Sequence, residues 1–376
     1  MNQQIMTVSN EKRLRAELMA AFESIRDVIA ETAEESEMLG ALAPKAVEAL
    51  KRAGMTRMRV PAEAGGWDAS PVAMMQVLIK MAEIDVAAAW NTMVMNNSAA
   101  FIAAFLPDPG FSDVFGKGVP NCAGAVPPAG EAVIVEGGFR LTGRWRLCSG
   151  VHQAEWVRLT TMTREEKPRR LFAIVPQKAL TILDGWNVIA LSGTGSNDVA
   201  LKDHFVPAHM TIWEEKRLRG GPQHRQRGLT ASSYEHTGIA IGIAQRALRE
   251  ASAALAARPG ASEVSLNQLG RLQIQLDAIT SHVMNRLEND YNRLADPAVD
   301  PDTIGLDNLA MSALATDLAR DCVELAYRIG GTAALYRPNI FERLLRDVHG
   351  ATQHVGVHGG HFTDVGARLV AAAKQQ

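Results

Sequence analysis

The strongest constraint on the fold is the spacing of apolar residues, which changes twice along this chain of 376 residues. Near the amino terminus, apolar residues recur every three or four positions, as at Leu14, Leu18 and Phe22. This is the period of a helix with one buried face. Short alternating segments replace it between about residues 122 and 208, and the helical period returns from about 230 to 372. The sequence therefore predicts a mainly α protein with a central β-domain.

The middle region carries strand and turn signals. Two apolar segments, AVIV at 132–135 and FRLT at 139–142, flank the pair Gly137-Gly138, which is the pattern of a β-hairpin. A further apolar run at 171–175 ends at Pro176. Several short strands separated by turns predict a small β-sandwich or barrel.

The last region again predicts long helices. Leu266, Leu269, Leu272, Leu276 and Ile279 form one helical stripe. The pairs Asp296-Pro297 and Asp300-Pro301 predict a break between two helices. Residues 210–230 are polar and rich in glycine, which indicates an exposed connector. The expected domains are an N-terminal helical domain (1–121), a central β-domain (122–208), a connector (209–229) and a C-terminal helical bundle (230–376).

Charge and cysteine content exclude several classes of protein. The chain has 39 Lys and Arg against 41 Asp and Glu, so it lacks the basic excess of a nucleic-acid-binding protein. Its three cysteines, Cys122, Cys148 and Cys322, form neither a disulfide framework nor a zinc motif, which favours a reduced compartment. The apolar stretches fall short of a membrane span, and the first residues lack a signal-peptide core. We expect a cytoplasmic protein without a membrane or nucleic-acid partner.

Common catalytic motifs are missing, but two segments could carry chemistry. Residues 193–196 read GTGS between two strand-like segments, which indicates a tight turn more than a phosphate loop at a helix start. Histidines gather at His349, His354, His358 and His361. On a helix, His354 and His358 would share a face. No carboxylate stands at a suitable spacing from these histidines to complete a metal site, so no metal is expected. Two interpretations of the histidines stay open: one of them acts as an acid or base in a pocket, or they are solvated residues on a helix.

Nine segments in order resemble the acyl-CoA dehydrogenase superfamily of flavoproteins, across nearly the whole chain. They are residues 50–54, 60–66, 83–90, 145–150, 193–198, 205–207, 242–248, 330–331 and 343–347. The resemblance implies a helical domain, a central β-barrel or sandwich and a C-terminal four-helix bundle. It also implies flavin between the β-domain and the bundle, and a homotetramer in which the flavin's far end touches a second subunit.

The tail of the chain separates two branches of this superfamily. One dehydrogenase subgroup carries a glutamate base shortly after an Arg-Asp pair, but no glutamate follows Asp347 here. Instead His354 follows Arg346-Asp347, which resembles the two-component flavin monooxygenases. These enzymes take reduced flavin, FMNH2 or FADH2, from a separate reductase. With O2 they form a C4a-hydroperoxyflavin and oxygenate a small, often aromatic or heteroaromatic, substrate. An acyl-CoA dehydrogenase or oxidase and a non-catalytic flavin-binding relative remain alternatives.

The resemblance also assigns roles to residues. His354 would deprotonate the substrate or bond the peroxide, and Ser149 would bond flavin N5 and slow loss of peroxide. The cofactor-binding residues it implies are Ala125, Trp145, Leu147, Cys148, Ser149, Arg258, Gly330 and Gly331. Trp145 and Leu147 would wall the flavin ring, and Arg258 would bind its phosphate. The two glycines would let the cofactor approach the backbone closely; alternatively, they only end a helix.

The substrate pocket departs from one subset of this branch. Trp90, Ser98 and His354 are expected to line it. Many aromatic hydroxylases carry a histidine eight residues after the tryptophan that matches Trp90, whereas this chain has Ser98. A phenolic substrate is therefore less favoured, and N-oxygenation of an amine or oxidation of a sulfur or indole compound stays open.

Overall fold

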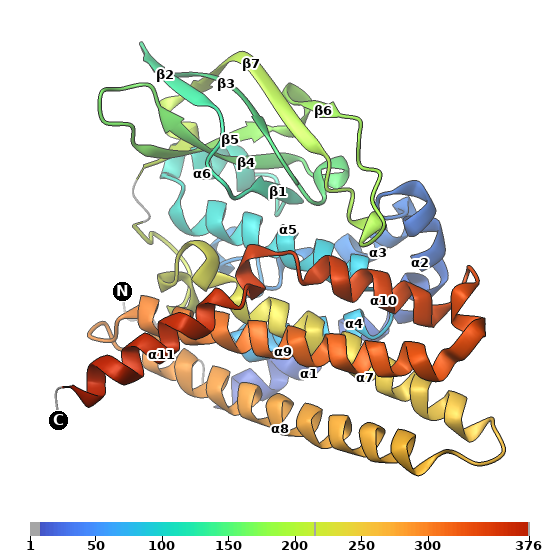
Figure 1. The fold of residues 1–376 in the computed structure, drawn as a ribbon. Coiled ribbons are helices and arrows are strands. Elements are labelled where there is room, and N and C mark those ends of the chain that lie inside the picture. The colour runs from blue at the N-terminus through green and yellow to red at the C-terminus, as the bar shows by residue number, and fades with distance from the viewer. Residues whose placement is uncertain (1–7, 214–215, 375–376) are drawn as a thin grey trace. The chain divides into compact units, whose positions relative to one another are not determined.

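The computed structural model describes residues 8–213 and 216–374, which divide into two compact units (Figure 1). The first unit comprises residues up to 70 together with 90–188 and 192–224. The second comprises 71–89, the short segment 189–191 and the chain from 225 onward.

The helices of the first unit include those that carry the predicted amino-terminal stripe. They are α1 (Val8–Glu23), α2 (Arg26–Leu39), α3 (Pro44–Arg52), α6 (Asp108–Phe115) and the part of α5 (Val86–Phe105) from Trp90 onward. Leu18 and Phe22 of that stripe are buried and Leu14 is partly buried. Ile25 and Ile29, which continue the same spacing, are buried as well. Pro44 begins α3, where its missing N–H costs no helical hydrogen bond.

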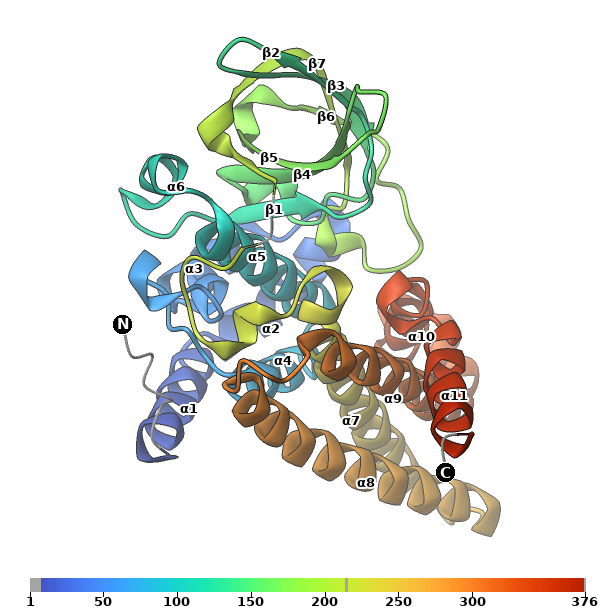
Figure 2. The same ribbon diagram turned by 90° about the vertical axis from the view of Figure 1, so that its left-hand side faces the viewer.

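The strands of the first unit form one mixed sheet. They are β1 (Cys122–Ala125), β2 (Glu131–Val135), β3 (Gly138–Trp145), β4 (Trp156–Thr163), β5 (Arg170–Pro176), β6 (Thr181–Leu183), β7 (Asp198–Pro207) and β8 (Thr211–Ile212). The order is β6-β7-β3-β2-β4-β5-β8, with β1 parallel to β4. Strands β2 and β3 form the predicted hairpin, and the sheet curls into a barrel-like ring (Figure 2).

The second unit is a helical bundle. It contains α4 (Pro71–Ala82), α7 (Ser233–Ala256), α8 (Glu263–Leu294), α9 (Pro301–Gly330), α10 (Ile340–Ala351) and α11 (Gly360–Ala373). The predicted break between α8 and α9 is present: Asp300 caps α9 by accepting from the Asp302 N–H, and Pro301 is its first residue. Leu276 and Ile279 of the predicted α8 stripe are buried, whereas Leu266 is 51% exposed.

The expectation that residues 210–230 are exposed is wrong for much of the described segment. Gln223 and His224 are buried, and His224 Nε2 lies 3.1 Å from Asp68 Oδ1. The Arg217 guanidinium donates to the Gly221 carbonyl oxygen at 2.7 Å. Gln223 and His224 can be buried because each has a hydrogen-bond partner, Asp68, within its own unit. Glu214 and Glu215, also in this segment, lie outside the described residues.

Residues 8–213 and 216–374 contain no helix that could span a membrane. None of the helices there combines the length and the apolar composition that crossing a bilayer requires.

Candidate functional site

The turn after β3 presents an apolar side chain on an unusual backbone. Leu147 has φ of 58°, a left-handed conformation that non-glycine residues rarely adopt, and its side chain is 57% exposed. The Leu147 N–H donates to Asp198 Oδ1 at 3.2 Å, and the Cys148 N–H donates to the Asn197 carbonyl oxygen at 3.0 Å. The surrounding bonds therefore maintain a strained turn, which is common at ligand sites.

Ser149 belongs to a chain of hydroxyl groups. Its Oγ lies 2.6 Å from Ser196 Oγ, which in turn lies 2.7 Å from Thr194 Oγ1. Thr194 and Ser196 are buried, whereas Ser149 is only partly so. Thr194 and Ser196 come from the GTGS motif, which forms a short 3₁₀ turn before β7, in agreement with its interpretation as a tight turn. The motif thus orients the Ser149 hydroxyl.

Two other residues of the same turn are fully buried. The Trp145 ring lies in the core of the β-sheet, and its Nε1–H donates to the Thr160 carbonyl oxygen at 2.7 Å. Burial raises the pKa of the Cys148 thiol to about 12, so Cys148 is a neutral packing residue. Leu147 is therefore the side chain on this turn that can pack on a flavin ring, and Trp145 and Cys148 can contribute only through their backbone.

The structure places Ser98 beside the strand that contains Ala125. A β-carbon added at Gly124 would lie 2.9 Å from Ser98 Oγ, so β1 approaches α5 closely at this point. The Ala125 carbonyl oxygen accepts from Thr160 Oγ1 at 3.0 Å. Trp90, which also lies on α5, is buried together with Ser98. The first unit thus brings the strand that contains Ala125 close to Ser98, although the Ala125 side chain lies on the opposite face of that strand.

In the second unit, Gly331 and Arg258 lie near each other although 73 positions separate them in the numbering. Gly331 has φ of 62° and ψ of −148°, a combination that is essentially restricted to glycine. A β-carbon there would lie 3.9 Å from Arg258 Nη2. Arg258 follows the end of α7 and is exposed. The exposed guanidinium of Arg258, next to the backbone of Gly331 that no side chain covers, could bind a phosphate group.

Gly330 has a packing explanation. A β-carbon at this position would lie 2.8 Å from the Phe341 ring and 3.0 Å from Ala334 Cβ. The structure therefore accounts for Gly330 through the close approach of α10 to the end of α9. Its predicted role toward a cofactor stays a prediction.

His354 lies between α10 and the next short turn, and it stacks on His236 of α7. The centroids of the two rings are 4.2 Å apart, and the planes are inclined by 32°. Burial lowers the pKa of His354 to about 4. Burial, and secondarily the charge of His354, lowers the pKa of His236 well below its ordinary value. Both imidazoles are therefore neutral near pH 7.

The tautomer of His354 follows from its backbone partner. His354 Nδ1 accepts from the Gly356 N–H at 3.1 Å. A neutral imidazole has one acceptor nitrogen and one N–H, so Nε2 carries the proton. The shared helical face proposed for His354 and His358 is absent, because α10 ends at Ala351. His354 instead caps the short turn Val355–Val357, and His358 Nδ1 accepts from the N–H of Gly360 at the start of α11.

The Arg-Asp motif before His354 fixes α10 within the second unit. Asp347 is buried and accepts from the Leu191 N–H at 2.8 Å, and Arg343 pairs with Asp85 at 2.9 Å. Burial raises the pKa of Asp347 to about 6, and the nearby Arg343 opposes that rise. Arg346 donates to the Ile189 carbonyl oxygen at 2.9 Å. These bonds position the segment that leads to His354.

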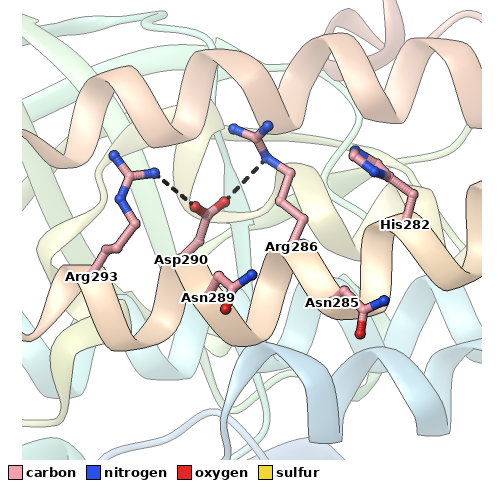
Figure 3. A pocket seen from close by; sticks show the side chains of 6 residues that line it. All are labelled: His282, Asn285, Arg286, Asn289, Asp290 and Arg293. Carbon is pink, nitrogen blue, oxygen red and sulfur yellow. Dashed lines mark hydrogen bonds and ion pairs between the residues drawn. The ribbon is translucent and has the colours of Figure 1, made fainter.

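A surface cavity of about 320 Å³ on α8 is a weaker candidate (Figure 3). Its lining comes from one helix: His282, Asn285, Arg286, Asn289, Asp290 and Arg293. Asp290 lies between Arg286, at 3.3 Å, and Arg293, at 3.1 Å, so its charge is already matched. In the part of the chain that the structure describes, no group of three or more His, Cys, Asp or Glu could hold a metal ion.

Two functional candidates were not found by sequence reasoning. His236 is a single histidine in the first turn of α7, between Glu235 and Thr237, and only the fold brings its ring against His354. Arg158 of β4 lies beside Ser98 and Gly124, and no motif marks it.

Comparisons with known proteins place similar sequences in one family. The family models for the N-terminal and C-terminal domains of acyl-CoA dehydrogenases match residues 10–106 and 234–358. The indole-3-acetate monooxygenase of Pseudomonas putida is 26% identical over 370 residues, covering 92% of each chain. The HsaA oxygenase subunit of a flavin-dependent monooxygenase from Rhodococcus jostii is 28% identical, covering 52% of this chain and 51% of its own.

A solved structure gives the same fold. XiaF from a Streptomyces species, in complex with FADH2 and glycerol, superposes with a TM-score of 0.87 at 24% identity. The match covers 95% of this chain and 97% of XiaF. The two family models and the predicted helix–strand–helix order together show that the chain belongs to the acyl-CoA dehydrogenase superfamily.

Proposed function

We propose that this protein is the oxygenase component of a two-component flavin-dependent monooxygenase. It would take FMNH2 or FADH2 from a separate reductase and use O2 to oxygenate a small aromatic or heteroaromatic substrate. The observation that carries this proposal is His354, a neutral imidazole after an Arg-Asp motif that no glutamate follows. The names of the relatives, a monooxygenase and an oxygenase subunit, support the same class.

The residues present fit a flavin. Leu147 offers an exposed apolar side chain on a fixed turn, and Ser149 offers a hydroxyl oriented by Ser196. Gly331 exposes backbone beside the Arg258 guanidinium, where a phosphate could be bound by charge-assisted hydrogen bonds. Within the first unit, Leu147 and Ser149 are suited to a flavin ring system. Within the second unit, Arg258 and Gly331 are suited to a phosphate.

Bound reduced flavin would supply two electrons and, with O2, the C4a-hydroperoxyflavin that delivers one oxygen atom. The other oxygen atom leaves as water, which takes up the two protons that balance the reaction. The protein's task is then to keep bulk water away and to place hydrogen-bond donors where charge develops. The hydroxyl of Ser149 would bond the flavin near N5 and slow the loss of peroxide.

His354 is suited to donate a hydrogen bond. Its Nδ1 is occupied by the Gly356 N–H, and its Nε2 carries the proton. It would therefore stabilise an oxygen that gains negative charge during transfer. The earlier interpretation, in which His354 deprotonates the substrate, would require this backbone bond to break and a pKa of about 4 to rise.

N-oxygenation of an amine is a second candidate. It is favoured by Ser98, which stands where many aromatic hydroxylases of this branch have a histidine. A serine hydroxyl cannot assist ionisation of a phenol near neutral pH as an imidazole can.

The proposal is tested by turnover with a generic flavin reductase, NADH and O2. Candidate indoles, phenols, aromatic amines and sulfides are supplied, and oxygenated product, hydrogen peroxide and consumed NADH are measured. We expect product from at least one class, with incorporation of one atom of labelled oxygen. Reduction of bound flavin by an acyl-CoA thioester, with no oxygenated product, would instead establish a dehydrogenase or oxidase.

A further inference from the structure

Arg158 occupies an unusual position for a charged residue. It lies on β4 and is partly buried. Its guanidinium carbon is 4.5 Å from the ring centroid of Phe101 on α5 and 5.8 Å from that of Phe172 on β5. Two aromatic faces therefore hold the cation in a fixed orientation. All three residues belong to the first unit.

The register of the sheet places Arg158 on the face that meets Ser98. Strand β1 pairs with β4 so that Gly124 stands opposite Arg158. Their neighbours Ala123, Ala125, Val157 and Leu159 are buried in the core of the sheet. Because side chains alternate along a strand, Gly124 and Arg158 lie on the opposite face.

The lack of a side chain at Gly124 brings two polar groups to one point. A β-carbon there would lie 2.9 Å from Ser98 Oγ, 3.3 Å from Arg158 Nε and 3.5 Å from Arg158 Nη2. A hydroxyl and a guanidinium thus border the same position, next to aromatic rings. The charge of Arg158 also acts on the thiol of Cys148, the residue that precedes Ser149.

We propose that Arg158 binds a carboxylate on the aromatic substrate and so determines which substrates are accepted. This inference rests on the proposed monooxygenase function and on Ser98 lining the substrate site. The planar guanidinium matches the two oxygens of a carboxylate, and Ser98 adds a neutral donor beside it. Phe101 and Phe172 hold the guanidinium plane and add an apolar surface for a ring.

The test uses pairs of ligands that differ only in charge. Indole-3-acetate is compared with indole-3-acetamide, and 4-hydroxyphenylacetate with 4-hydroxyphenylacetamide. Their dissociation constants are measured by anaerobic calorimetry with the reduced-flavin form of the full-length protein. We expect the wild type to prefer at least one acid over its amide by about 10- to 100-fold, as for a charge-assisted hydrogen bond.

Two variants and one control complete the test. Arg158→Gln should lose about 10- to 100-fold in affinity for the acid and little for the amide, and Arg158→Lys should keep part of the preference. Arg169→Gln is the matched control, because Arg169 also stacks on an aromatic ring, Trp213 at 4.4 Å, but is exposed. It should keep the wild-type preference.

The outcomes separate this inference from the proposed function. Equal affinity of the wild-type protein for acids and amides, or an unchanged preference in a folded Arg158→Gln variant, would overturn the role of Arg158. In that case, oxygenated product from neutral substrates would leave the monooxygenase proposal standing. Absence of any oxygenated product from either kind of substrate would count against the monooxygenase proposal itself.

Discussion

Acidification should destabilise the protein through His354, and the size of the effect can be estimated from the structure. The pKa of His354 is about 4 in the folded protein, against an ordinary value of 6.5. Below pH 6.5 the unfolded chain therefore takes up a proton that the folded protein refuses until about pH 4. The free energy of unfolding falls across that window, by about 3 kcal/mol in total and about 2 kcal/mol between pH 7 and pH 5.

The effect is measured as a difference between two proteins. His354→Gln keeps a side-chain acceptor for the Gly356 N–H but does not titrate in this range. Urea unfolding, followed by tryptophan fluorescence at pH 7 and pH 5, gives the loss of stability for each protein. The wild type should lose about 2 kcal/mol more than the variant. His236, which stacks on His354, is present in both proteins and contributes to both losses.

The reasoning would be refuted by equal losses in the two proteins. Equal losses would mean that His354 titrates normally in the folded state, and hence that its buried, neutral form is wrong. A larger loss in His354→Gln would have the same meaning.

Three further predictions concern the cofactor and the assembly. Ser149→Ala should raise hydrogen peroxide release, whereas His354→Ala should lower product yield by about 10²-fold or more while oxygen still reacts with the flavin; similar behaviour of the two variants would contradict the separate roles. Reduced flavin should bind far more tightly than oxidised flavin in anaerobic and aerobic dialysis, and Arg258→Gln should weaken that binding; retention of oxidised flavin through purification would argue for a dehydrogenase. Light scattering should give a tetramer, since Leu266 on α8 and Leu369 on α11 are exposed apolar residues; a monomer mass at micromolar concentration would refute this.

Local patterns predicted the elements of the fold well. The helical stripe at Leu18 and Phe22 and the hairpin around Gly137 depend on neighbours within a few positions, so the sequence alone predicts them. The segment that contains His224 was predicted to be exposed because it is polar. Its burial depends on Asp68, more than 150 positions away, and no local pattern reports such a partner.

The candidate site could be predicted only in part. A family motif indicates His354, but its tautomer depends on the Gly356 N–H and its pKa on burial. Arg158 looks like an ordinary outward-facing strand residue, because it and Ser98 border the same point at Gly124 only once β1 pairs with β4 and approaches α5. Trp145 was predicted to wall the flavin, yet its ring is a core residue of the sheet.

The most direct test of the central claim is rapid mixing of the reduced-flavin protein with O2. The protein is loaded anaerobically with FMNH2 or FADH2, and the flavin absorbance is followed in a stopped-flow instrument after oxygen is added. We expect a transient flavin–oxygen adduct that persists without substrate, decays faster in Ser149→Ala, and yields oxygenated product when substrate is present. Direct return to oxidised flavin, with no intermediate in either protein, would contradict this expectation.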